Sequence, residues 1–386
     1  MNKKSVTILA ILGLLLLLPL FVTDNEYPLE VGDFKNDVAR AEQAKIGGDV
    51  HDFSNHYFGR TIMAYTVGRI SKVTGLSCTY IQLGINYILL LASCFMIYFL
   101  VTKLFGILAG TLSAVLVMFC THGVAQLFFA GDIWNIIVMC LLLVPAFYFL
   151  AKWLAGNQKK YLVTILLLFA VFSSVHSLAL ILPYVLGLFF GSYVIYKLVR
   201  KQYKSAMNAS LLLLGIIAGN LMLSYVFVPD AIGLHLSVIT GTIPVGMDSN
   251  PIIFYGERIP VSVASLIFTY ITIPVIAVLG ISLAVWNNSK AKIELNSECK
   301  WFLALLACFI VPLIVAAMFG SSLDPGRHAM NAGILMTIVT GCIVGKVMVA
   351  NKLPKWHSMT FKTATLAVVT SGIIPSLLVW FGVSGR

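Results

Sequence analysis

Long apolar stretches, separated by short charged or turn-forming segments, recur from one end of the chain to the other. An apolar helix of about 18 residues or more is long enough to cross a hydrocarbon core of roughly 30 Å. The pattern predicts an all-α polytopic membrane protein, a single transmembrane domain over residues 1–386, with about eleven transmembrane helices. The predicted spans lie near residues 5–23, 80–102, 107–129, 134–152, 161–175, 178–197, 206–228, 259–286, 301–319, 329–348 and 362–382.

Composition supports this class. Of the 386 residues, 59% are hydrophobic and 11% are charged, whereas a soluble domain carries about 25% charged residues. The seven cysteines are scattered through apolar runs without a C-x-x-C pair, which favours a packing role. No A-x-A-like cleavage site follows the first apolar run, so we expect an uncleaved first span.

Basic residues are concentrated in the short segments between spans. With the N-terminus in the cytoplasm, the inner segments hold seventeen of the 26 Lys and Arg residues, but only Glu294 and Glu298 of the 15 acidic residues. An excess of Lys and Arg in cytoplasmic loops sets the orientation of membrane proteins. The net charge of +11 is therefore a topology signal beside membrane lipid, and we expect no nucleic-acid partner. The short loops favour a cell inner (plasma) membrane.

Two predicted extracytoplasmic loops are long, at residues 24–79 and 229–258. The first holds eight carboxylates and a segment that we expect to form interfacial, juxtamembrane helices. Six of the seven histidines also fall near or beyond the outer membrane boundary, at His51, His56, His122, His176, His235 and His328. Elaborated loops on one face suggest chemistry or binding on that face.

The first loop contains a candidate site. Residues 33–45 have apolar positions at helical spacing and are followed by Gly47 and Gly48, which predicts a short helix with a glycine stop. Asp33, Asp37 and Arg40 would then share a face. Such a group can hold a metal ion, orient a sugar hydroxyl or act as a general base. The alternative is an Asp33 N-cap followed by a solvated charged face.

Four further residues are candidates near the same membrane surface. His56 and Tyr57 suit sugar contacts, although the histidine spacing fits no common zinc pattern and a plain polar loop is the alternative. Asp132 opens the fourth predicted span, where an ionisable group is expensive unless it is wet or paired, or where it serves as a helix N-cap. His176 lies in the turn between the fifth and sixth spans, where neighbouring serines are enough to satisfy it.

Arg327 and His328 lie in the segment SLDPGRHAM, just before the tenth predicted span. A guanidinium fork with a neighbouring imidazole donor is suited to a phosphate or pyrophosphate group. The alternative is an interfacial anchor.

In this order, the features resemble the C-type glycosyltransferase superfamily (GT-C), polytopic enzymes that use polyprenyl-phosphate-linked sugars. The resemblance rests on Asp33 within EVGDFKNDVARAEQAKIGGD, the segment GRTIMAYTVGRISKVTG, Asp132 within GDIWNIIVMCLLLVPAFYFLAKW, His176, and Arg327 within SLDPGRHAMNAGILM. The chain departs from the family pattern at His328, where an aromatic residue is common. It also has Asp37 four residues after Asp33 in place of adjacent acidic residues.

The resemblance implies sugar transfer from a polyprenyl-phosphate donor to a glycan, lipid or protein acceptor on the extracytoplasmic face. Asp33 would act as the base and Asp132 would orient the acceptor or assist an ion. Arg327 with His328 or His176 would stabilise the departing phosphate. The further substrate contacts would be Asp37, Arg40, His56 and Tyr57. A divalent cation, Mg or Mn, held by Asp33 and Asp132 is left open.

Two other classes compete with the enzyme. A transporter or flippase for a lipid-linked or anionic substrate needs polar groups along a path through the bilayer. The mid-span polar residues Asn208, Asn220 and Thr269 are neutral and typical of helix packing, and no inverted repeat is evident. A non-catalytic membrane scaffold would tolerate the loss of Asp33.

Overall fold

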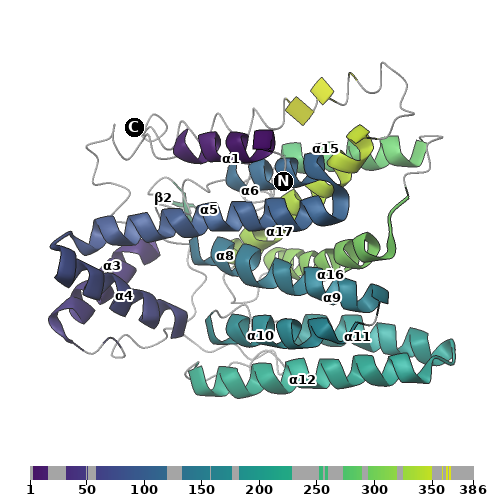
Figure 1. Ribbon diagram of the computed structural model, residues 1–386, viewed down its shortest axis with the longest axis horizontal. Helices are drawn as coiled ribbons and strands as arrows, with labels where there is room; N and C mark the ends of the chain where they lie inside the picture. Colours follow the sequence, from purple (N-terminus) through teal and green to yellow (C-terminus); the bar gives the residue numbers. More distant parts are fainter. Residues whose placement is uncertain are drawn as a thin grey trace.

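The structure is a computed structural model of the chain, predominantly helical, with its long helices side by side (Figure 1). It describes residues 3–15, 32–48, 50, 58–119, 133–156, 158–175, 182–227, 252–254, 257–259, 273–288, 294–319, 325–349, 359, 362–363 and 365–366. The helices are α1 (Lys3–Leu15), α3 (Gly32–Ile46), α4 (Phe58–Thr74), α5 (Cys78–Phe105), α6 (Ile107–Phe119), α8 (Ile133–Ile137), η2 (Val138–Leu143), α9 (Val144–Gly156), α10 (Lys160–Val175), α11 (Leu182–Val199), α12 (Tyr203–Phe227), α15 (Ile273–Asn288), α16 (Ser297–Phe319) and α17 (Pro325–Val349).

Six described helical segments are long and apolar enough to cross a membrane. They are Cys78–Phe105, Val138–Gly156, Leu182–Val199, Tyr203–Leu223, Ser297–Ile314 and Asn331–Val349, and two shorter apolar helices cover Ile107–Met118 and Lys160–Val175. Each of the eight lies on a predicted span, which confirms a polytopic helical membrane protein. The count of eleven spans stays a prediction, because most of the last predicted span, 362–382, lies outside the described residues.

Close helix packing in the bundle depends on glycine. α17 packs against α6, α15 and α16, and α5 packs against α6. A Cβ added at Gly345 of α17 would lie 2.4 Å from the Cα of Ala109 on α6, and one at Gly341 would lie 2.3 Å from the Ser113 hydroxyl. Ser113 Oγ donates to the carbonyl of Ile338 over 3.2 Å. Inside a membrane, small residues let two helix backbones approach closely. A serine side chain on one helix can then bond to a backbone carbonyl of the other.

The fourth predicted span is interrupted by a π-helical turn, η2, between α8 and α9. The amide of Val144 donates to the carbonyl of Met139, five residues earlier, and Pro145, which has no amide hydrogen, follows directly. Buried rings fix the helix after the turn: the ring centroid of Phe147 is 6.5 Å from that of Phe169 and 5.8 Å from that of Phe309. The part of this span that follows the turn is thereby held in the core of the bundle.

α3 and α4 form a pair of short helices at one end of the molecule (Figure 1). α3 covers the segment for which the sequence predicts a helix, and Gly47, at φ 82°, follows its last residue. The two helices approach closely at Gly68, where an added Cβ would lie 2.6 Å from the carbonyl oxygen of Ala41. Within the first long loop, residues 24–79, the structure describes this pair and residues 47, 48, 50 and 75–79.

A short antiparallel hairpin accompanies the helices. β1 (Ile252–Phe254) pairs with β2 (Glu257–Ile259), with Ile252 opposite Ile259. Ile and Phe fit an extended strand, and the two residues between the strands are Tyr255 and Gly256. The hairpin lies at the end of the second predicted loop and reaches the first residue of the predicted span 259–286. Within that span, α15 begins at Ile273.

Candidate functional site

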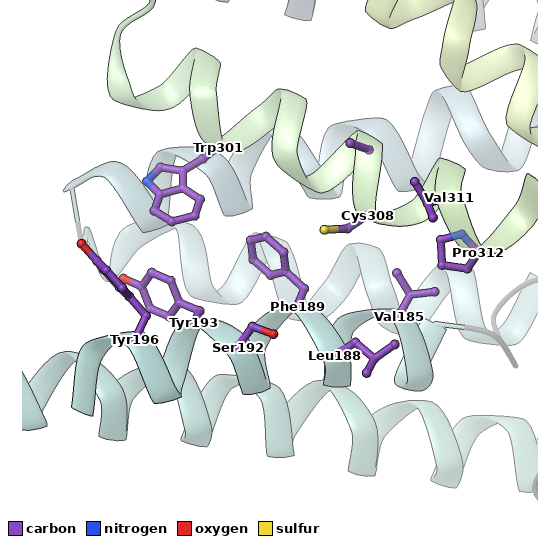
Figure 2. Close-up of a pocket in the computed structure, with 11 residues that line it drawn as sticks. Val185, Leu188, Phe189, Ser192, Tyr193, Tyr196, Trp301, Cys308, Val311 and Pro312 are labelled. Carbon is purple, nitrogen blue, oxygen red and sulfur yellow. The ribbon is translucent and has the colours of Figure 1, made fainter. Parts of the chain in front are cut away.

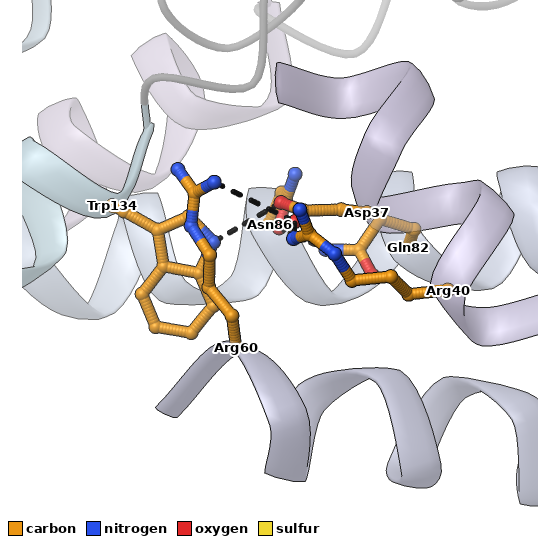
Figure 3. A network of polar contacts seen from close by, with 6 residues as sticks. All are labelled: Asp37, Arg40, Arg60, Gln82, Asn86 and Trp134. Carbon is orange, nitrogen blue, oxygen red and sulfur yellow. Dashed lines mark hydrogen bonds and ion pairs between the residues drawn. The ribbon is translucent and has the colours of Figure 1, made fainter. Parts of the chain in front are cut away.

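A buried polar cluster joins the α3–α4 pair to the membrane bundle (Figure 3). It draws on four helices: α3, α4 and α5, which follow one another in the chain, and the more distant α8. We use the name polar cluster for Asp37 and Arg40 of α3, Arg60 of α4, Gln82 and Asn86 of α5, and Trp134 of α8.

Asp37 is the centre of the polar cluster. Its Oδ1 lies 2.8 Å from Nη1 of Arg40 and 4.0 Å from Nη1 of Arg60. Its Oδ2 accepts a hydrogen bond from Nε1 of Trp134 over 3.2 Å. Asp37 is 6% exposed and Arg40 is 2% exposed. Buried charges are tolerated when they are paired and hydrogen-bonded, and these contacts satisfy that condition for the carboxylate.

The local sequence explains why α3 carries this pair on its inner face. Asp37 and Arg40 are three residues apart, so they lie on one side of the helix. Phe34 and Ala41, at 0% exposure, belong to the same side, and Val38 packs against the buried core. The prediction that Asp37 and Arg40 share a face is confirmed. The alternative of a solvated charged face is wrong for these two residues, because both are buried.

Two amides on α5 complete the polar cluster. Gln82 Nε2 donates to Asn86 Oδ1 over 2.9 Å, and both side chains are buried. Within the described part of the chain, Gln82 Oε1 has no hydrogen-bond partner. Both amides are drawn with the Asp37–Arg40 pair in Figure 3, and their helix, α5, packs against α3. Sequence reasoning missed them, although two amides four residues apart inside an apolar helix are an available signal.

A further buried amide lies on α17. Asn331 is 0% exposed, and neither Nδ2 nor Oδ1 has a partner among the residues that the structure describes. It follows Arg327 and His328 by one helical turn; both lie in the first turn of α17, and their side chains are outside what is described. α17 also contacts α5, α8 and η2. The helix that carries the predicted phosphate-binding residues thus packs on two helices of the polar cluster.

The other predicted site residues have these positions. Asp33 lies in the first turn of α3, one turn before Asp37, with its side chain outside the described set. Asp132, His56, Tyr57 and His176 lie outside the described residues. Asp132 precedes Trp134 by two positions in the chain. Sequence reasoning missed Arg60 and Trp134 as site residues, although each lies within a quoted segment.

A metal site has limited support from the polar cluster. Among the residues that the structure describes, no three His, Cys, Asp or Glu side chains come together. Asp37 is the carboxylate in the polar cluster, and two guanidinium groups already face it. A carboxylate neutralised in this way is a poor cation ligand. The polar cluster therefore suits a positioning role better than metal binding.

The chain is a polytopic helical bundle in which the α3–α4 pair packs on α5 and is hydrogen-bonded to α8, and it has the fold of an oligosaccharyltransferase. Structures of the oligosaccharyltransferase from Archaeoglobus fulgidus share this fold, at 12% sequence identity. One structure holds an acceptor peptide containing the NVT sequon, tethered via a disulfide bond. Its TM-score with this chain is 0.59, over 100% of this chain and 56% of that one. The apo form has a TM-score of 0.61, over 98% of this chain and 56% of that one.

A third structure of that archaeal enzyme, AglB, in complex with an inhibitory peptide and a dolichol-phosphate, has a TM-score of 0.62 over 98% of this chain and 56% of that one. The chain therefore spans just over half the length of these neighbours. No protein-family model matches the sequence, and no curated protein matches it. The likeness shows the fold, and function has to be argued from the site.

Proposed function

We propose that this protein is a membrane glycosyltransferase that moves a sugar from a polyprenyl-phosphate-linked donor to an acceptor on the extracytoplasmic face. The observation that carries the proposal is the hydrogen bond from Trp134 Nε1 to Asp37 Oδ2. It ties the helix that contains Asp33 to the helix that begins just after Asp132. The bond supports our proposal that Asp33 and Asp132, from distant parts of the chain, act at one site.

In the proposed reaction, the acceptor hydroxyl attacks the anomeric carbon of the donor sugar. The new bond joins the acceptor oxygen to that carbon, the bond to the phosphate oxygen breaks, and Asp33 takes the hydroxyl proton. Asp132 orients the acceptor. Because the leaving group is already a stable anion, the site needs positioned donors more than a strong acid, and Arg327 with His328 or His176 supplies them. His56 and Tyr57 contact the sugar.

Asp37 and Arg40 have a different role in this proposal from the substrate contacts that the sequence predicts. Both are buried and paired with each other, so we assign them to positioning α3. A base has to be held within a fraction of an ångström of its target to be effective. The buried ion pair and the hydrogen bond from Trp134 hold α3 in place one helical turn after Asp33.

The neighbouring structures guide the choice of partners. That archaeal enzyme is seen with an acceptor peptide and with a dolichol-phosphate. We therefore propose a lipid-linked donor for this chain and leave glycan, lipid and protein as acceptor classes. A divalent cation, Mg or Mn, would be held by Asp33 and Asp132, where it would offset the charge of the phosphate.

Charge at the helix ends supports the proposed orientation. Lys103, Lys197 and Lys346 lie in the last turns of their helices, and Lys160 and Lys300 lie in first turns. In the proposed topology all five ends face the cytoplasm, and the polar cluster faces outward. The N-terminus would then be cytoplasmic and the membrane the cell inner (plasma) membrane.

The test is sugar transfer by the purified full chain from a panel of polyprenyl-phosphate sugars, followed by release of polyprenyl phosphate. We expect Asp33→Asn to lower turnover by roughly 10²-fold or more, the contribution typical of a general base. Glu42→Gln is the matched control, because Glu42 is an exposed carboxylate on the same helix, and it should leave turnover unchanged.

The same preparation distinguishes the transporter. The buried amides of Gln82, Asn86 and Asn331 place uncharged polar groups inside the bundle, which is the observation that favours a flippase as second candidate. If no donor is consumed while liposomes containing the protein move a lipid-linked sugar between leaflets, the enzyme should be abandoned for the transporter. Full turnover by Asp33→Asn would remove Asp33 as the base.

A further inference from the structure

An apolar groove of about 580 Å³ lies between α11 and α16 (Figure 2). Its size is in the range of sites that bind small organic ligands. Leu188 and Phe189 of α11 face Cys308 and Val311 of α16 across it. Leu188 is 71% exposed, and both helices are long and apolar enough to cross a membrane. The groove is therefore open to the hydrocarbon core on its outer side.

Small residues and a proline leave this space between the two helices. Ser192 and Ala307 line the groove with short side chains, and Pro312 stands inside α16. Proline in a helix interior removes a backbone hydrogen bond and favours a bend. The surface is otherwise hydrocarbon and aromatic ring, which suits an acyl chain.

One end of the groove is closed by aromatic side chains with polar atoms. The ring centroid of Trp301 is 5.4 Å from that of Tyr193 and 6.1 Å from that of Phe189. Tyr196, which is 52% exposed, lines the same end. Trp and Tyr favour the boundary between hydrocarbon and water, so this end lies at the level of lipid head groups.

Two cations stand over these tyrosines. Lys197 Nζ is 5.2 Å from the ring centroid of Tyr193, and Arg200 Cζ is 5.7 Å from that of Tyr196. Lys197 Nζ also donates to Gln202 Oε1 over 2.8 Å, and this bond holds the ammonium group at the groove mouth. Among the described residues, neither cation forms a salt bridge with a carboxylate. The mouth therefore carries positive charge that is available to an anion.

We propose that the groove binds an anionic phospholipid, with an acyl chain between α11 and α16 and the phosphate at Lys197 and Arg200. A chain of hydrocarbon ending in an anionic head group matches an apolar groove that ends in cations. Lys and Arg near the membrane surface attract anionic lipids in the same way. This end of α11 lies opposite the α3–α4 pair (Figure 1), so the proposal does not depend on glycosyl transfer.

The test uses tryptophan fluorescence of the full chain in nanodiscs that contain phosphatidylglycerol or phosphatidylcholine with brominated acyl chains. The chain has six tryptophans, so the difference from Trp301→Phe isolates the signal of Trp301. We expect brominated phosphatidylglycerol to quench Trp301 at a lower mole fraction than phosphatidylcholine does. Lys197→Gln should reduce that preference roughly fivefold, as expected for one cation at the membrane surface.

Two further variants separate the head-group site from the groove. Lys204→Gln removes a charge from an exposed position on α12, which does not line the groove, and should leave the preference unchanged. Ser192→Phe fills the groove from an exposed position and should reduce quenching by both lipids.

Three results would overturn the proposal. Equal quenching by the two lipids, insensitive to Lys197→Gln, would show that the groove does not select an anionic head group. Quenching independent of Trp301 would show that no lipid chain enters the groove. Relief of quenching by polyprenyl phosphate at a lower mole fraction than unlabelled phosphatidylglycerol would assign the groove to that lipid instead.

Discussion

At the scale of single residues, the carboxylate of Asp37 is shared by groups from α3, α4 and α8. The pairing brings two guanidinium groups to one buried anion. Breaking a buried ion pair from one side costs about 3–5 kcal/mol, whereas replacing both partners with apolar residues of similar volume is often neutral. The stability of the polar cluster therefore depends on its balance of charge.

The first prediction follows from that balance. We expect Asp37→Leu to lower the Tm of the purified protein strongly, because Arg40 and Arg60 then face each other without their shared anion. The double variant Asp37→Leu with Arg40→Met should recover part of the loss. Glu42→Leu, at an exposed position where the carboxylate lies 3.8 Å from Lys45 Nζ, should change Tm little. A double variant less stable than Asp37→Leu would contradict this account.

The second prediction concerns the bond between α3 and α8. Trp134→Phe keeps an aromatic ring but removes the indole donor to Asp37, a hydrogen bond to a charged group worth about 1.5–3 kcal/mol. We expect a lower Tm and, if α3 positions the base, a fall in kcat larger than any change in KM. Trp153→Phe, another buried tryptophan, on α9, is the control. Equal effects of the two substitutions would mean that the ring matters and the hydrogen bond does not.

At the scale of elements, the contact between α6 and α17 depends on two glycines of α17. A methyl group at Gly345 would meet backbone atoms of Ala109, which have no flexible end that can move away. Overpacking of this kind typically costs about 1–3 kcal/mol. The same contact holds α17 in place, and α17 carries Arg327, His328 and Asn331.

The third prediction compares a glycine in this contact with a glycine that has open space beside it. We expect Gly345→Ala to lower Tm, because its added Cβ would lie 2.4 Å from a backbone carbon. Gly219→Ala on α12 is the matched change, since an added Cβ there meets nothing within 4 Å. It should be neutral or stabilising, because alanine is the better helix former. A comparison of thermal unfolding in one detergent decides the point.

At the scale of the whole molecule, the helix ends divide into a basic end and an end that carries the α3–α4 pair and the polar cluster (Figure 1). Lys and Arg remain preferentially on the cytoplasmic side during insertion. If the orientation is as proposed, the first long loop faces outward and the turns rich in lysine face the cytoplasm.

The fourth prediction tests this orientation by chemical labelling of intact cells. A membrane-impermeant maleimide should label Gln43→Cys on α3 from outside, because this position is exposed. Lys159→Cys, beside α10, should be labelled after permeabilisation and not before. The unmodified chain gives the background from its own cysteines. The reverse pattern would invert the topology and place the polar cluster in the cytoplasm.

The sequence alone determined the membrane class and the approximate position of most spans. The reason is physical: a bilayer core is a uniform apolar solvent, so the hydrophobicity of each segment decides locally whether it crosses. The helix at Gly32–Ile46 and its shared face were also within reach, since helical period and a glycine stop are local signals. Local signals do not show which side chains meet in the folded protein. Asp33, Asp132, His176 and Arg327 therefore remain predicted site residues, identified by their sequence motifs.

The tertiary structure decided what that shared face contacts. Asp37 and Trp134 are 97 positions apart, and no local pattern links a carboxylate to an indole over that distance. Burial of the Asp37–Arg40 pair likewise depends on α4, α5 and α8 closing around α3, as does the choice of Arg60 as a second cation. Contacts of this kind arise from packing between helices, which one sequence does not specify position by position.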